Sequence, residues 1–166
     1  MYKKPNGILT WSVEEIAKAL RITPSDVREY FTDGRRVSFI LERRIAKEVL
    51  NGNIASNEGK EFDIVDHRGR KWEVRSISRS GVYFCPSYMV GSGRHFEEKG
   101  FLQKLEEIDG YILADIESFP DIPFWIIPSD IVKGWWNSNK IGTTTKISRD
   151  KALALISSIG ESKNGR

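Results

Sequence analysis

Hydrophobic and polar residues alternate on both sides of a short polar stretch between residues 62 and 77. Phe62–Val65 is an alternating run, residues 66–69 (Asp-His-Arg-Gly) have the composition of a turn, and Lys71–Ile77 alternates again. This pattern predicts a β-hairpin. Its second strand places alternate residues on opposite faces: Trp72, Val74 and Ser76 on one, and Glu73, Arg75 and Ile77 on the other.

Apolar residues spaced by three and four predict helices before and after the hairpin. In the helices before it, we expect Val27, Tyr30 and Phe39 to face the interior. The helix predicted over residues 96–108 carries its acidic residues on the outside. The predicted helices cover residues 13–20, 24–32, 37–50, 96–108 and 148–159, with a further short helix after Pro128.

Three more segments have the composition of strands. Val82–Met89 is rich in aromatic residues, whereas Gly110–Ile116 and Pro123–Ile127 are almost entirely apolar and are typical of interior strands buried on both faces. Helices, hairpin, strand, helix, two strands and a helix therefore follow one another. This order predicts an α/β fold with a mixed central sheet flanked by helices.

Composition limits the classes of protein that remain. The 166 residues suit one compact domain, and the single cysteine, Cys85, excludes an internal disulfide framework. No apolar run approaches the ~18 residues of a membrane span, so we expect a cytoplasmic protein with no membrane contact. Residues 1–95 hold 17 Lys/Arg against 12 Asp/Glu, whereas residues 96–166 hold 9 against 11. This basic bias of the first part weakly favours a polyanionic partner.

The charged face of the hairpin is the first candidate site. Glu73 and Arg75 share that face, and Asp63 on the partner strand can lie opposite them. Two carboxylates and a cation that converge on one face attract a divalent metal ion and a phosphate. An exposed hairpin with a solvated charged face gives the same pattern, and this alternative stays open.

Asp63-X-X-Asp66, the turn at Gly69 and Glu73-Val74-Arg75-Ser-Ile resemble the metal site of the PD-(D/E)XK nucleases. The spacing is similar to that of the small type II restriction endonucleases, with Arg75 in place of the family's lysine. The resemblance implies a restriction-endonuclease-like domain over residues 35–160 and a Mg²⁺ ion, with Mn²⁺ as a substitute. The metal ligands that it implies are Asp63, Glu73 and the carbonyl of Val74. In the family an early helix often carries a glutamate near the metal, and Glu42 is the candidate; an intrahelical ion pair of Glu42 with Lys47 or Arg43 is the alternative.

The activity implied by the resemblance is site-specific cleavage of double-stranded DNA by phosphodiester hydrolysis. Cutting both strands with one site per chain needs two copies, so we expect a homodimer. In the family the lysine orients the attacking water. Arg75 can supply positive charge and hydrogen-bond donors, but a guanidinium does not lose its proton near neutral pH and cannot act as a general base.

Residues 1–34 contain a second candidate site, a segment that resembles a helix-turn-helix unit. Ser12 and Thr23 are suited to cap two successive helices, and Ala17, Ile22 and Val27 have the spacing of their packing contacts. The outward residues of the second helix would then face a DNA major groove, and they are Ser25, Arg28 and Thr32. An ordinary helical hairpin that packs on the main domain is the alternative.

A second set of expected DNA contacts follows the hairpin. Tyr83 and Ser87 share one face of the predicted strand 82–89, and Arg94 and His95 belong to a glycine-rich loop suited to approach a phosphate. Residues 161–166 are expected to be a disordered tail. Two other functions stay open: a sequence-specific DNA-binding protein that uses residues 10–32, and a catalytically silent nuclease relative or subunit.

Overall fold

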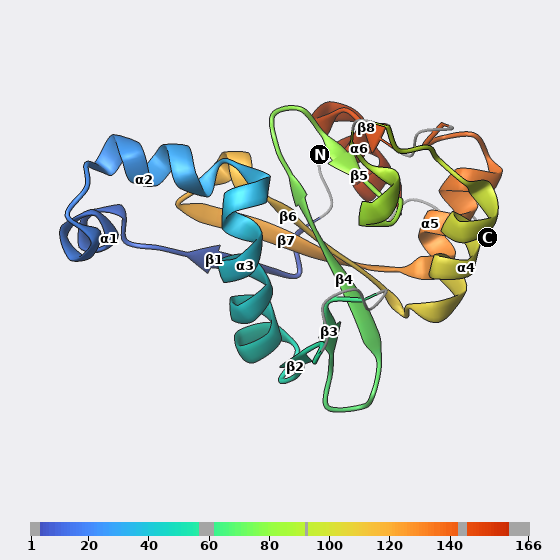
Figure 1. Cartoon of the computed structure of the whole chain (residues 1–166), viewed down its shortest axis with the longest axis horizontal. Helices are drawn as coiled ribbons and strands as arrows, with labels where there is room; N and C mark the ends of the chain where they lie inside the picture. The colour runs from blue at the N-terminus through green and yellow to red at the C-terminus, as the bar shows by residue number, and fades with distance from the viewer. Residues whose placement is uncertain (1–3, 57–61, 92, 143–145, 160–166) are drawn as a thin grey trace.

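The computed structural model describes residues 4–56, 62–91, 93–142 and 146–159, which form a mixed α/β fold (Figure 1). The strands are β1 (Gly7–Thr10), β2 (Asn53–Ile54), β3 (Ile64–Val65), β4 (Lys71–Ile77), β5 (Val82–Tyr83), β6 (Gly110–Asp115), β7 (Asp121–Pro128) and β8 (Lys146–Ile147). The α-helices are α1 (Val13–Leu20), α2 (Pro24–Phe31), α3 (Gly34–Arg44), α4 (Glu98–Glu107), α5 (Ser129–Asn137) and α6 (Arg149–Ser158). Three single turns complete the described elements: π-helical η1 (Ile45–Val49) and 3₁₀-helical η2 (Ser87–Met89) and η3 (Ile116–Ser118).

Six strands form the central sheet in the order β1-β7-β6-β4-β3-β2. β4 and β6 are parallel, and the other neighbouring pairs are antiparallel. The chain between β4 and β6 includes α4, because parallel strands need a long crossover connection. The predicted α/β fold class with a mixed sheet is therefore confirmed.

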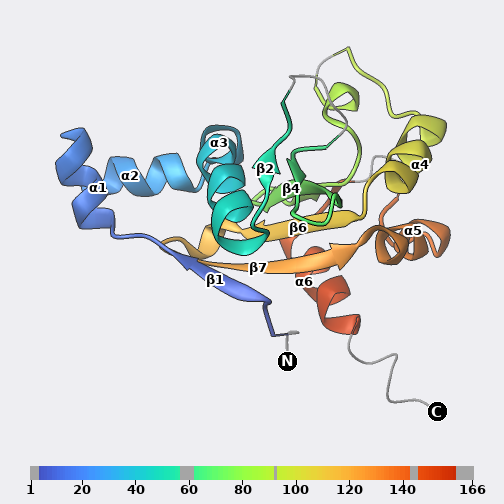
Figure 2. The same ribbon diagram turned by 90° about the horizontal axis from the view of Figure 1, so that it is seen from below.

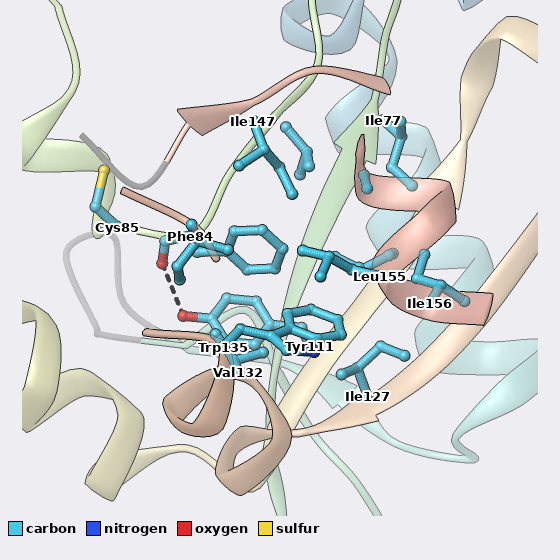
Figure 3. Packing of buried hydrophobic residues seen from close by; sticks show 14 of the residues in the cluster. Ile77, Phe84, Cys85, Tyr111, Ile127, Val132, Trp135, Ile147, Leu155 and Ile156 are labelled. Atoms are coloured by element: carbon cyan, nitrogen blue, oxygen red, sulfur yellow. Dashed lines mark hydrogen bonds between the residues drawn. The ribbon is translucent and has the colours of Figure 1, made fainter. Parts of the chain in front are cut away.

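The sheet separates two hydrophobic cores, because successive side chains of a strand point to opposite faces. On one face, Val74 and Ile112 pack with Val27 and Leu41 from the N-terminal helices. On the other face, Tyr111 packs with Phe84, Trp135 and Ile156 from the C-terminal half (Figure 3). Figure 2 shows α3 and α6 on opposite sides of β6 and β7.

The N-terminal helices are connected to the sheet by a strand that the sequence pattern did not predict. β1 pairs with β7 at the sheet edge, and Leu9 is buried in the same core as Val13 and Ala17 of α1. The predicted caps are confirmed, since Ser12 accepts a hydrogen bond from the backbone of Glu15 and Thr23 forms a capping box in α2. Arg21 ends α1 with a left-handed φ of 57°.

The predicted burial of two residues in these helices is wrong. Tyr30 is 37% exposed, and Phe31 is buried instead, because Phe31 lies four residues after the buried Val27 on one helix face. Phe39 is 60% exposed, whereas Val37, Leu41 and Ile45 form the buried stripe of α3 and η1. The expected single helix 37–50 is thus α3 followed by the π-helical turn η1.

The predicted strand 82–89 is also wrong for most of its length. Only β5 is a strand, which pairs with β8, and Ser87–Met89 forms the turn η2. Pro86 lies between them and has no N–H to donate to a sheet ladder. The expected disordered tail 161–166 lies outside the described residues.

Candidate active site

The candidate site lies where the predicted hairpin stops pairing as a ladder. β3 pairs with β4 at Ile64↔Trp72 and Val65↔Lys71, so the hairpin is confirmed, but β6 pairs with β4 as far as Ile77. Asp63 continues beside β4 for one more residue: its N–H donates to the Trp72 carbonyl (3.0 Å), and its Oδ2 accepts from the Val74 N–H (2.8 Å). The carboxylate of Asp63 is therefore fixed at the edge of β4.

Glu73 lies next to this edge and is 4% exposed. Its Oε1 is 2.6 Å from Nη2 of Arg75 and 2.8 Å from Nζ of Lys104. A buried carboxylate needs such partners, because desolvation of an unpaired charge costs several kcal/mol. The two expected carboxylates and Arg75 thus come together, and a lysine joins them.

Negative charges crowd this part of the molecule. Burial and the charge of Glu73 raise the pKa of Asp63 to about 6, although the Val74 N–H opposes this shift. Burial, followed by the charges of Asp63 and Glu73, raises the pKa of Glu42 to about 7. The carboxyl group of Glu42, on α3, therefore interacts electrostatically with the carboxylates of the hairpin.

Arg75 connects β4 to the chain that follows β5. Its side chain is 19% exposed, and Nη2 donates to the Cys85 carbonyl (3.0 Å) as well as contacting Glu73. Burial opposes the charged form, but Glu73 and Asp63 outweigh it and raise the pKa of Arg75 further. Its buried Nε has no hydrogen-bond partner among the described residues.

Lys104 is the site residue that the sequence analysis missed. It belongs to α4 and is 4% exposed, as buried as the carboxylate that it contacts. Burial lowers the pKa of Lys104, and the charge of Glu73 opposes that shift. One sequence signal was present: Lys104 lies on the apolar stripe formed by Phe101, Leu105 and Ile108, where a lysine needs a buried partner.

These residues line a cleft of about 1680 Å³. Residues of α2 and α3 line it from the N-terminal half, and residues from β5 to Arg94, together with Lys146, line it from the C-terminal half. Exposed Arg35 and Arg94 also line it, as does Arg36, which is paired with Glu29 and Asp33 of the same lining. The cleft therefore combines buried carboxylates with cations.

The expected DNA contacts divide into two groups. Thr32, Tyr83, Ser87 and Arg94 line the cleft, and Nη1 of Arg94 donates to the carbonyls of Ser87 (3.0 Å) and Val90 (3.2 Å). A second group is exposed but does not line the cleft: Ser25, Arg28 and His95. The structure thus brings only the first group to the carboxylates.

The second aspartate of the hairpin, Asp66, has a different environment. It is 5% exposed and accepts hydrogen bonds from the backbone N–H groups of Arg68 and Arg70, from Nε of Arg70 and from the indole of Trp72. Burial alone would raise the pKa of Asp66, but these donors hold it well below its usual range. The hydrogen-bonding capacity of the Asp66 carboxylate is thus met by donors of the hairpin itself.

The ligand atoms at this edge fit a metal site in which water fills several coordination positions better than one made of protein ligands alone. Among the residues that the structure describes, no three His, Cys, Asp or Glu side chains form a cluster that could hold a metal ion. Asp63 and Glu73 supply two carboxylates, and the Val74 carbonyl faces the same edge as its N–H, toward Asp63. Mg²⁺ fits this set, because it is usually held by one or two carboxylates and keeps several waters.

Comparisons with known proteins identify no relative of this chain. No family model matches the chain, and neither a curated protein nor a solved structure is significantly similar to it. Within the described part of the chain, no helix is long and apolar enough to cross a membrane.

Proposed function

We propose that this protein is a metal-dependent endonuclease that hydrolyses phosphodiester bonds of double-stranded DNA, with a restriction-endonuclease-like catalytic domain. One observation carries the proposal: the Asp63 carboxylate is bound to the Val74 N–H beside buried Glu73, at a strand edge that opens into a large cleft. A folded hairpin without such a role has no need to bring two carboxylates together at a cost in electrostatic free energy.

The chain's own residues have separate roles in this proposal. Asp63, Glu73 and the Val74 carbonyl would hold Mg²⁺, or Mn²⁺ as a substitute. The bound ion would activate a water molecule and neutralise charge on the phosphoryl oxygens. Glu42, whose pKa is about 7, can hold or release a proton near neutral pH at the same cleft. Arg75 stays protonated and adds positive charge.

The residues that line the cleft support a nucleic-acid substrate. Arg35, Arg94 and Lys146 of its lining suit a phosphate backbone, and Tyr83 and Ser87 offer a hydroxyl group each for polar contacts. Two copies of the chain are needed to cut both strands of a duplex, and so the proposal includes a homodimer.

The experiment is cleavage of duplex DNA in Mg²⁺ and in Mn²⁺, compared with the same reaction in excess chelator. Parent protein is expected to nick or cut, and Asp63→Ala and Glu73→Ala are expected to abolish cleavage. Glu106→Ala is the matched control, because Glu106 is 71% exposed on α4 and does not line the cleft. Full cleavage by Glu73→Ala would contradict the proposal. Specific DNA binding by a parent protein that never cuts would favour the DNA-binding alternative.

A further inference from the structure

We propose that Lys104 is the cation that contacts the scissile phosphate, and that Arg75 is a positioning residue that holds Glu73. The inference rests on the proposed endonuclease function and assigns a further residue to its site. Both cations contact the same atom, Glu73 Oε1, at 2.8 Å and 2.6 Å. The rest of their environment is different, and this difference separates their roles.

Arg75 is held by two acceptors from different parts of the chain. Its Nη2 joins Glu73 of β4 to the Cys85 carbonyl, directly after Phe84. The Phe84 carbonyl is itself fixed by the hydroxyl of the buried Tyr111, which donates to it at 2.7 Å (Figure 3). A planar guanidinium in this position cannot turn toward a substrate without losing both contacts. Arg75 therefore sets the position of Glu73.

Lys104 approaches Glu73 from α4, which belongs to the crossover connection between β4 and β6. Its ammonium group has three N–H donors on a flexible stem, so a contact with Glu73 is compatible with a second contact to an oxygen that enters the cleft. Lys104 is among the residues that line the cleft. A divalent cation at Asp63 and Glu73 would also weaken the attraction between Glu73 and the ammonium group, because it adds positive charge next to Lys104.

The step that Lys104 assists is a balanced hydrolysis. The oxygen of water bonds to phosphorus, one P–O ester bond breaks, and its electron pair leaves on the alkoxide oxygen. Water's proton ends on that oxygen, so the products are a phosphate monoester and an alcohol. Lys104 donates a hydrogen bond to a non-bridging phosphoryl oxygen, where negative charge develops, and it is not consumed.

The test compares the same substitution at the two positions. Lys104→Met and Arg75→Met each remove a charge and keep a chain of similar bulk, and Lys99→Met on the exposed side of α4 is the control. Single-turnover cleavage is measured at saturating DNA across a Mg²⁺ titration, with Ca²⁺-dependent DNA binding as a second measurement. We expect Lys104→Met to lower the saturated rate by about 10²–10³-fold, the range for one lost transition-state donor. Its affinity for DNA in Ca²⁺ should stay within about threefold of the parent value, since the lost contact strengthens only in the transition state.

Arg75→Met is expected to act on the metal requirement instead. Its Mg²⁺ midpoint should rise because Glu73 is less well placed, while the saturated rate stays within about tenfold of the parent, a smaller loss than that of one transition-state donor. Lys104→Cys alkylated with 2-bromoethylamine restores an ammonium group at nearly the original length. Recovery of the rate after alkylation, with no change in identically treated parent protein, is the result expected for a direct role.

Two results would overturn the inference and leave the proposed function intact: a parent protein that cuts DNA while Lys104→Met cuts equally fast, or a saturated rate lost in Arg75→Met but kept in Lys104→Met. Should Lys104→Met fail to fold by circular dichroism, Lys104→Gln and the alkylated cysteine variant answer the same question. A parent protein that cuts no DNA in Mg²⁺ or Mn²⁺ removes the proposed function itself, and the role of Lys104 with it.

Discussion

Asp63 and Asp66 lie three residues apart in one hairpin, yet their environments have opposite effects on the carboxylate. Asp66 accepts four hydrogen bonds from its own turn and from Trp72, and its pKa is far below the usual range although it is buried. Asp63 accepts a hydrogen bond from the backbone N–H of Val74, but burial, followed by the charge of Glu73, raises its pKa to about 6.

This difference separates a residue that stabilises the fold from one that is suited to a ligand. The charge of Asp66 is matched by donors of the protein, so the folded state stabilises the ionised form. The charge of Asp63 is desolvated by burial and repelled by Glu73, so the folded state destabilises the ionised form in the absence of a bound cation. The same residue type in one hairpin thus stabilises the fold at Asp66 and is suited to bind a cation at Asp63.

The largest expected difference between substitutions at Asp63 and Asp66 is in the rate of DNA cleavage. Asp63→Asn keeps the shape of the side chain and an oxygen for the Val74 N–H, but it removes a metal-binding charge. We expect cleavage in Mg²⁺ to fall by at least about 10²-fold, on the scale of a lost transition-state interaction. Asp66→Asn, assayed at a temperature where it is folded, should cut within about threefold of the parent rate, since it touches no transition-state group. Equal loss in both variants would remove the distinction between the two aspartates.

The second difference is in stability. Asp66→Asn should lower the free energy of unfolding by about 2–3 kcal/mol, because hydrogen bonds to a buried charge are lost and donors are left unmatched. For a chain of this size the melting temperature should fall by roughly 5–10 °C. Urea unfolding at pH 7 gives the measurement, with Glu106→Gln as the exposed control. No change in Asp66→Asn would show that the turn donors contribute nothing net.

The third difference is the pH dependence of stability, and the signs are opposite. The folded pKa of Asp63 is raised, so the protonated side chain costs little at low pH, and its ionisation lowers stability as pH rises from about 4 to above 6. Asp63→Asn should therefore raise the free energy of unfolding by about 1–2 kcal/mol at pH 8 and change it little at pH 4. For Asp66 the lowered pKa gives stability that is present above about pH 4 and lost as pH falls below it. A destabilised Asp63→Asn protein at pH 8 would contradict the first sign.

The smallest expected effect concerns DNA binding at the cleft. Arg94 lines the cleft, whereas exposed Arg28 on α2 does not. If Arg94 contacts a phosphate, Arg94→Ala should weaken binding in Ca²⁺ for every sequence alike and reduce the salt slope by about 1. If α2 contacts base edges, Arg28→Ala should alter the preference between cognate and scrambled duplexes. DNA titrations at several salt concentrations distinguish the loss of a phosphate contact from the loss of a base contact. An unchanged salt slope in Arg94→Ala would show that Arg94 does not contact the DNA backbone.

The local parts of this architecture could be predicted from sequence. The turn at residues 66–69, the caps at Ser12 and Thr23, and the interior strand 110–116 each depend on neighbours within a few residues. Periodicity also placed Glu73 and Ile77 on the face opposite Trp72, as the two cores confirm for Ile77 and Trp72.

Long-range contacts could not be predicted in the same way. β1 becomes a strand because β7, more than a hundred residues later, offers it an edge. Lys104 contacts Glu73 only because the crossover between the parallel strands β4 and β6 includes α4, and the spacing of charged residues in the sequence does not encode that contact. The hairpin half of the candidate site was therefore predictable, and the α4 half was not.

The central claim is that Asp63 and Glu73 form one metal site, and anomalous diffraction from crystals soaked in Mn²⁺ tests it most directly. We predict an anomalous peak within ligand distance of both carboxylates and of the Val74 carbonyl, and no peak there in Asp63→Asn crystals soaked identically. Mn²⁺ bound only elsewhere, or unchanged contacts of Glu73 with Arg75 and Lys104 in a soaked crystal without a peak at this edge, would contradict the claim.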